Sequence, residues 1–93
     1  MLEKQIEKAV CDYAKSKGIL VYKFSSPAHR SVPDRMFITP EGHMFMIEFK
    51  SAKGRVTSAQ VREMARLTDY GISVFLVRSI ENGRQIIDKE WFN

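Results

Sequence analysis

Two acidic residues and a lysine stand at the ends of a predicted β-hairpin. Asp34 is separated from Glu48 by thirteen residues, and Lys50 follows two residues after Glu48. The intervening segment, 36–47, contains two apolar runs joined by a turn-like stretch with a proline and a glycine. Antiparallel strands bring their far ends side by side. We therefore expect Asp34, Glu48 and Lys50 to lie close together in space.

These three residue types suit one kind of chemistry. Side chains two residues apart on a strand point to the same face, so Glu48 and Lys50 should project together. Two carboxylates that converge on one point make a hard-oxygen site suited to Mg²⁺ or Mn²⁺. A lysine beside such an ion can orient an attacking water or stabilise charge that develops on a phosphate. The pattern is therefore that of a site for phosphodiester hydrolysis.

Each of these residues also has a plainer interpretation. Asp34 follows a proline and could cap a turn. Glu48 and Lys50 could form a solvated strand end or pair with each other. The segment 44–49 is apolar on both alternating faces, which argues against a solvated end, and a buried ion pair is seldom a net gain. We favour the metal site.

The elements that must position this site can be read from hydrophobic periodicity. A helix is predicted over 2–17, where apolar residues recur at three- and four-residue steps, and a strand over 19–24. After a loop, 25–31, comes the hairpin, followed by a basic turn at 51–55. A capping-box pattern at 57–60 predicts a second helix running to about Tyr70, and a fourth strand is predicted over 72–77.

This order, α-β-β-β-α-β with a tail, predicts a single α/β domain over residues 1–93. The strand 44–49 should lie near the middle of the sheet because both of its faces are apolar. Its connection to 72–77 through a helix predicts a parallel crossover. The tail, 79–93, contains Glu81-Asn82-Gly83, which could be a turn or an irregular helix start. Its apolar residues could pack on the sheet or on a second subunit.

The phase of the first helix ranks its acidic residues. At about 100° per residue, Glu3 lies about 60° from the centre of the apolar stripe and Glu7 about 100°. Glu3 is therefore predicted to face inward in preference to Glu7. Cys11 is assigned to the polar side of the helix.

Length and composition limit the possible classes of protein. The chain has 93 residues and a net charge of +4, so it is one small, mildly basic domain that is compatible with an anionic partner. Cys11 is the only cysteine, which excludes an intrachain disulfide and a cysteine-based zinc site. No apolar run approaches the roughly 18 residues of a membrane span, and the N-terminus is not that of a signal peptide. We expect a cytoplasmic protein with no membrane partner.

The wider pattern resembles the VRR-NUC family of the PD-(D/E)xK nuclease superfamily. The resemblance rests on Glu3 with Ile6, on Val32-Pro33-Asp34, on Ile47-Glu48-Phe49-Lys50, and on Thr57-Ser58-Ala59-Gln60. It covers almost the whole chain, from Glu3 to about Val77, and implies a restriction-endonuclease-like core with a mixed central sheet flanked by helices. The chain departs from the family in the loop before Pro33, where members often have a glycine.

The resemblance implies a role for each matched residue. Asp34 and Glu48 would bind Mg²⁺ or Mn²⁺, together with the backbone carbonyl of Phe49. Lys50 would position the hydrolytic water, and Glu3 would reach the metal directly or through water. Gln60 would complete the catalytic set, although its place in the capping box explains it equally well without catalysis.

The activity implied is that of a metal-dependent, structure-selective DNA endonuclease. Stand-alone VRR-NUC domains of this size resemble phage or bacterial Holliday-junction resolvases that work as homodimers. A two-fold dimer supplies two equivalent sites for the two symmetric cuts that a four-way junction needs. The alternatives are a nuclease acting on flaps, nicks or ends, a catalytically idle DNA-binding module of the same fold, and an interaction domain with incidental carboxylates.

Candidate DNA contacts cluster in sequence around the proposed site. Few aromatic residues lie among them, which predicts recognition of backbone and shape over the reading of bases. They are Lys23, His29, Arg30, Arg35, Lys53, Arg55 and Arg62.

Overall fold

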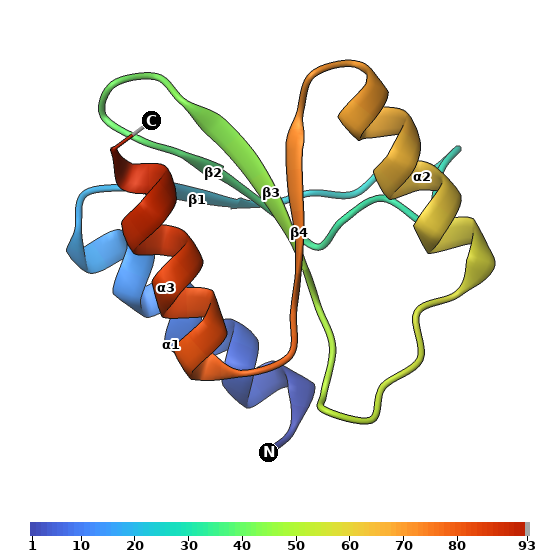
Figure 1. The fold of residues 1–93 in the computed structure, drawn as a ribbon, viewed down its shortest axis with the longest axis horizontal. Coiled ribbons are helices and arrows are strands. Elements are labelled where there is room, and N and C mark those ends of the chain that lie inside the picture. Colours follow the sequence, from blue (N-terminus) through green and yellow to red (C-terminus); the bar gives the residue numbers. More distant parts are fainter. Residues whose placement is uncertain (93) are drawn as a thin grey trace.

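The computed structural model describes residues 1–92 as a mixed four-stranded sheet with three helices (Figure 1). The strands are β1 (Leu20–Lys23), β2 (Arg35–Ile38), β3 (Met44–Phe49) and β4 (Ser73–Val77), in that spatial order. β2 pairs antiparallel with both β1 and β3, and β4 runs parallel to β3. The predicted α/β class, the inner position of 44–49 and the parallel crossover are confirmed.

Helix α1 (Glu3–Ser16) begins and ends within one residue of the predicted limits. It stops where Gly18 adopts a φ of +81°, a conformation that glycine reaches without the penalty that a Cβ brings. Its buried side chains, Ile6 and Val10 among them, pack on one face of the sheet against Phe45, Ile47 and their neighbours. This packing fixes α1 beside the hairpin that carries the candidate site.

Helix α2 (Ser58–Asp69) connects β3 to β4 and lies apart from the other helices (Figure 1). Thr57 caps it as predicted: its side chain accepts a hydrogen bond from the N–H of Gln60, and the Gln60 side chain accepts one from the N–H of Thr57. No residue of α2 is fully buried. The helix therefore covers its side of the sheet incompletely.

The tail forms a regular helix, α3 (Ile80–Trp91), where the sequence suggested only a turn or an irregular start. Ser79 caps it by accepting a hydrogen bond from the N–H of Asn82. Gly83 packs so closely against Val10 that a Cβ at this position would overlap the valine side chain. The glycine is thus an inter-helix contact, and Ile87 completes the core between α3, α1 and the sheet.

The assignment of Cys11 to the polar side of its helix is wrong. The residue is 5% exposed and belongs to the core cluster. Burial raises the pKa of the Cys11 thiol to about 11, so the group stays protonated and unreactive near neutral pH.

Among residues 1–92, no helix combines the length and apolar character that crossing a bilayer requires.

Candidate active site

Asp34 and Glu48 meet at the open end of the β2–β3 hairpin. Arg35 is paired with Ile47, which places the preceding Asp34 across from the following Glu48. Oδ2 of Asp34 accepts a hydrogen bond of 2.8 Å from the N–H of Phe49, and the carbonyl of Asp34 accepts one of 2.9 Å from Phe24. Both neighbouring strands therefore hold Asp34 in place.

Glu48 is a nearly buried acid with polar partners. It is 3% exposed, and its Oε2 accepts a hydrogen bond of 3.1 Å from Nε2 of Gln60. Nζ of Lys50 lies 3.6 Å from the same oxygen. Burial, with the charge of Asp34 as a second cause, raises the pKa of Glu48 to about 7, although Lys50 acts in the opposite direction.

The pKa of Asp34 is also raised. Burial is the main cause, and the charge of Glu7 adds to it, while the Phe49 N–H acts in the opposite direction. Two neighbouring carboxylates that both resist ionisation lack enough positive charge nearby. That electrostatic state favours a cation between them.

Gln60 makes both the capping contact and a hydrogen bond to the candidate site. Its Oε1 accepts from the N–H of Thr57 at 3.0 Å, which closes the capping box, while its Nε2 donates to Glu48. The side chain therefore fixes the first turn of α2 against the end of β3.

The structure separates the two acids of α1. Glu3 is exposed, whereas Glu7 is partly buried and pairs through Oε2 with Nε of Arg35 at 2.6 Å. The expectation that Glu3 faces further inward than Glu7 is wrong, because Arg35 draws Glu7 towards the sheet. Both acids still act on the site: Glu3 raises the pKa of Glu48, and Glu7 raises that of Asp34.

The donor set fits a hard divalent cation. The hydrogen bonds described above use Oδ2 of Asp34 and Oε2 of Glu48, so each carboxylate has a second oxygen outside them. Within residues 1–92, no three Asp, Glu, His or Cys side chains are grouped so that they could hold an ion. Asp34 and Glu48 thus form a two-carboxylate pair, the kind of site in which Mg²⁺ keeps several waters.

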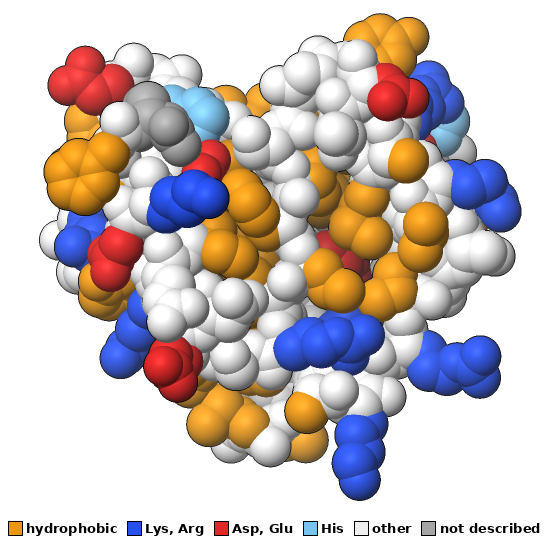
Figure 2. All heavy atoms as spheres, in the orientation of Figure 1, with side chains coloured by type: hydrophobic (Ala, Val, Ile, Leu, Met, Phe, Trp, Pro, Cys, Tyr) orange, Lys and Arg blue, Asp and Glu red, His pale blue; other side chains and the backbone are white. Residues whose placement is uncertain are grey.

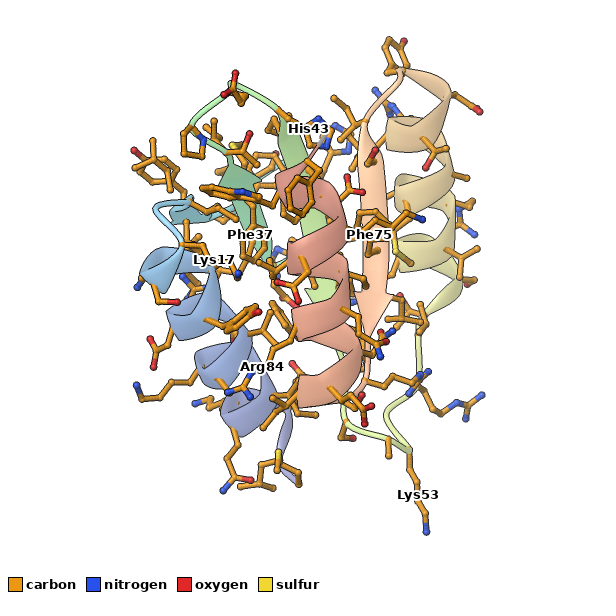
Figure 3. The ribbon with its side chains drawn as sticks, turned by 60° about the vertical axis from the view of Figure 1, so that its left-hand side comes forward. Lys17, Phe37, His43, Lys53, Phe75 and Arg84 are labelled. Atoms are coloured by element: carbon orange, nitrogen blue, oxygen red, sulfur yellow. The ribbon has the colours of Figure 1, made fainter. Side chains whose placement is uncertain are left out.

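The candidate DNA contacts fall in three places. Lys23 lines a groove along α1 with Asp34 and with Arg35, whose guanidinium is engaged by Glu7. His29, Arg30 and Arg62 line a cleft between the 25–31 loop and α2. Lys53 and Arg55 are exposed on the turn after β3, and Figure 3 shows Lys53 extending away from the body of the molecule.

Sequence reasoning missed Arg78. Its Nη1 donates hydrogen bonds to the carbonyls of Ser51, Ala52 and Gly54, at 2.8, 3.3 and 2.7 Å. The N–H of Lys50 donates to Val77, immediately before Arg78. The end of β4 therefore anchors the basic turn that follows Lys50, and no short-range signal in the sequence announces this contact.

The space around these residues is a hollow on the α2 side of the sheet. Figure 2 shows it between β4 and α2, with hydrophobic side chains on its walls, an acidic side chain at its floor and basic side chains along its lower rim.

His43, at the other end of the hairpin, is hydrogen-bonded to Glu90, with Nε2 2.8 Å from Oε1. The chemistry-bearing residues thus gather at one end of the sheet.

Comparison with known proteins identifies a relative of this chain. The chain is 38% identical over 77 residues to "Putative nuclease p44" of Acyrthosiphon pisum secondary endosymbiont phage 1, with 83% of each chain covered. No family model matches it.

Two solved structures share the fold. One, described as a VRR_NUC domain, superposes with a TM-score of 0.84 at 28% identity and covers 92% of this chain and 94% of its own. Another, a VRR_NUC domain protein, gives a TM-score of 0.75 at 18% identity over 97% and 88% of the two chains. The sequence relative and the shared fold together support a nuclease. The chain belongs to the VRR-NUC family.

Proposed function

We propose that this protein is a metal-dependent, structure-selective DNA endonuclease that resolves four-way junctions as a homodimer. The observation that carries the proposal is the convergence of Asp34 and Glu48 at the hairpin end, with Lys50 and Gln60 on the same oxygen of Glu48. A buried carboxylate that shares its position with a second acid is costly in a protein that only binds DNA. It is useful where a cation must be held against a phosphate.

The residues of the site divide the work. Asp34 and Glu48 would hold Mg²⁺ or Mn²⁺, with the Phe49 carbonyl as a further ligand and Glu3 acting through water. Lys50, whose side chain is 14% exposed, would orient the attacking water and offset the charge that develops on the phosphate. Gln60 would keep the Glu48 carboxylate turned towards the ion. When bound, the ion supplies a Lewis acid that polarises the phosphate and lowers the pKa of a bound water.

The preference for a four-way junction is inferred from the single site in each chain and from apolar surface that a second copy could cover. A chain of 93 residues with one such site cuts one strand, whereas resolving a four-way junction needs two symmetric cuts. Leu20 and Tyr22 on the edge strand β1 are 53% and 52% exposed, which leaves apolar surface for a second copy. The phage relative is consistent with work inside a bacterial or phage-infected cell.

A panel of DNA substrates tests the activity. Purified protein with Mg²⁺ or Mn²⁺ should nick a synthetic four-way junction in preference to a flap and to a plain duplex of the same sequence. Equal cutting of all three would overturn the resolvase assignment. A preference for the flap would identify the second candidate, a nuclease directed at flaps, nicks or ends. If the protein binds DNA but does not cut it with either metal, the nuclease proposal fails and a catalytically idle DNA-binding module is the remaining candidate.

Sedimentation tests the dimer separately. At micromolar concentration we expect a mass of two chains. A monomer that still makes paired cuts in a junction would contradict the symmetry argument.

A further inference from the structure

A second basic surface lies beside the candidate site, in a cleft between the 25–31 loop and α2. The cleft has a volume of about 430 Å³. His29 and Arg30 line it from the loop, and Arg62, Glu63 and Arg66 line it from the helix. We call it the loop–helix cleft.

Helix α2 presents two different faces to its surroundings. Gln60 is turned towards β3, where it donates to Glu48. Ala59, Arg62 and Arg66 follow one another at three- and four-residue steps and face the cleft instead. The helix that completes the candidate site therefore also forms a wall of the cleft.

The 25–31 loop also links the cleft to the candidate site, on the side opposite α2. Ser31 lines the cleft, and Asp34 follows three residues later. The loop is held in shape by hydrogen bonds from the N–H of His29 to Ser26 and from the N–H of Val32 to His29. One wall of the loop–helix cleft thus leads to Asp34, and the other leads to Gln60, which donates to Glu48.

The charge of the cleft points to an anion. Arg30, Arg62 and Arg66 are all exposed, and none of them is paired with a carboxylate among residues 1–92, whereas Arg35 is paired with Glu7. Glu63 is the single acid in the lining. Arginine forks match phosphate oxygens well because they can donate two parallel hydrogen bonds.

The lining favours a sugar–phosphate backbone over bases. Its small members, Ala28, Ser31 and Ala59, leave space, and His29 is its only ring. Recognition of unpaired bases normally uses several aromatic platforms. Phosphate contacts need only cations and donors, which the cleft has.

We propose that the loop–helix cleft binds phosphates of the cut strand on one side of the scissile phosphate, through Arg30, Arg62 and Arg66. The inference deepens the proposed function and rests on it. It assigns a substrate-positioning role to Arg66.

The test is the salt dependence of DNA binding. Asp34→Asn protein, which should not cut, is titrated with a four-way junction at several salt concentrations, alone and with Arg62→Gln/Arg66→Gln added. Loss of two phosphate contacts should reduce the slope of log Kobs against log [salt] by about 1.8, at about 0.9 per contact to duplex DNA. Lys89→Ala, an exposed cation on α3, is the matched control and should leave the slope unchanged.

A charge-preserving variant separates the role of these arginines from folding. Arg62→Lys/Arg66→Lys should retain the wild-type slope, because each lysine still neutralises one phosphate. In proteins with an intact Asp34, the glutamine variant should raise KM at least tenfold with little change in kcat. A slope and KM equal to those of Lys89→Ala would overturn the proposal.

The same measurements distinguish failure of the cleft from failure of the proposed function. If the wild type cuts DNA but the salt slope is unchanged in Arg62→Gln/Arg66→Gln, the cleft does not bind phosphates and the nuclease proposal still stands. A protein that never cuts, but whose slope falls in that variant, would overturn the nuclease and the cut-strand assignment together, leaving only a phosphate-binding cleft.

The position of the contact can then be mapped. A neutral methylphosphonate placed at single positions flanking the mapped cut should weaken binding on one side only. At those positions the methylphosphonate should not weaken binding further in Arg62→Gln/Arg66→Gln, because that variant has already lost the arginine–phosphate contact. Equal losses in both proteins would contradict the assignment.

Discussion

The Gln60 side chain joins the start of α2 to the acid at the end of β3, with its Nε2 3.1 Å from Oε2 of Glu48. The other end of the same amide accepts from the N–H of Thr57. One residue therefore helps to cap the start of a helix and contacts a candidate metal ligand. These two effects can be measured separately.

Replacing Gln60 by alanine removes both contacts, whereas replacing Thr57 by alanine removes only the cap that it offers to the N–H of Gln60. We expect each change to lower the free energy of unfolding by about 1 kcal/mol. Only Gln60→Ala should also reduce kcat, by about tenfold, because Glu48 is then free to turn. Urea denaturation and cleavage assays report the two effects, and equal kcat values for the two variants would show that Gln60 is only a cap.

The ionisation of Glu48 predicts an unusual pH dependence in metal-free protein. In the unfolded chain this carboxyl ionises near its ordinary pKa of 4.5, whereas in the folded protein the pKa is about 7. Between these values the unfolded chain binds fewer protons, so stability falls as pH rises. The raised pKa of Asp34 acts in the same direction.

The loss should be on the order of 2 kcal/mol across that interval. Denaturation in chelator at pH 5 and pH 8 measures it. Glu48→Gln should abolish most of the decline, since the buried charge is gone. The carboxyls with lowered pKa, Asp12 and Asp88, titrate below this range and do not mask the effect. Wild-type stability that rises between pH 5 and pH 7 would contradict the description of Glu48.

Arg78 should control the order of the turn after Lys50. Arg78→Ala removes the donors to three carbonyls of 51–54, so the turn should open more often. Because Lys53 and Arg55 are trypsin sites, the rate of tryptic cleavage there should rise several-fold. Arg78→Lys, which keeps one donor group, should give an intermediate rate. An unchanged rate in Arg78→Ala would mean that the turn is held by other contacts.

Gly83 should not tolerate a side chain. In Gly83→Ala the added Cβ would overlap Val10, so α1 and α3 must move apart. We expect a loss of about 1 to 3 kcal/mol, despite the higher helix propensity of alanine. Gln85→Ala, at an exposed position of the same helix, is the control and should be nearly neutral. A stabilised Gly83→Ala protein would show that the two helices separate at little cost.

The approach of Asp34 to Glu48 was predictable because it depends on local rules. The hairpin register follows from the lengths of its two apolar runs, and that register alone places Asp34 opposite Glu48. The capping box of α2 was equally readable, since Thr57 and Gln60 are three residues apart. The contact of Gln60 with Glu48 was not, because it depends on how the crossover helix lies on the sheet.

The errors share one cause, which is long-range packing. Cys11 lines the groove along α1 together with Lys23 and Arg35 from β1 and β2, so packing on the sheet widens the buried stripe of the helix. The tail likewise gave no clear sign of α3. Glu7 is drawn inward by Arg35, which lies 28 residues away in the chain. The three acceptors of Arg78 are backbone carbonyls. Every residue type has such a carbonyl, so the sequence does not reveal the contact.

Asp34 is the residue on which metal-dependent cleavage should depend most directly. Wild-type protein should nick a four-way junction in Mg²⁺ or Mn²⁺ and stop when chelator removes the ion. Asp34→Asn keeps an oxygen that can accept from the N–H of Phe49 but loses the charge that would hold the cation. We predict that this variant binds the junction as tightly as the wild type and reduces cleavage at least a thousandfold, which is about 4 kcal/mol in the activation barrier. Cleavage by Asp34→Asn at the wild-type rate would contradict the account.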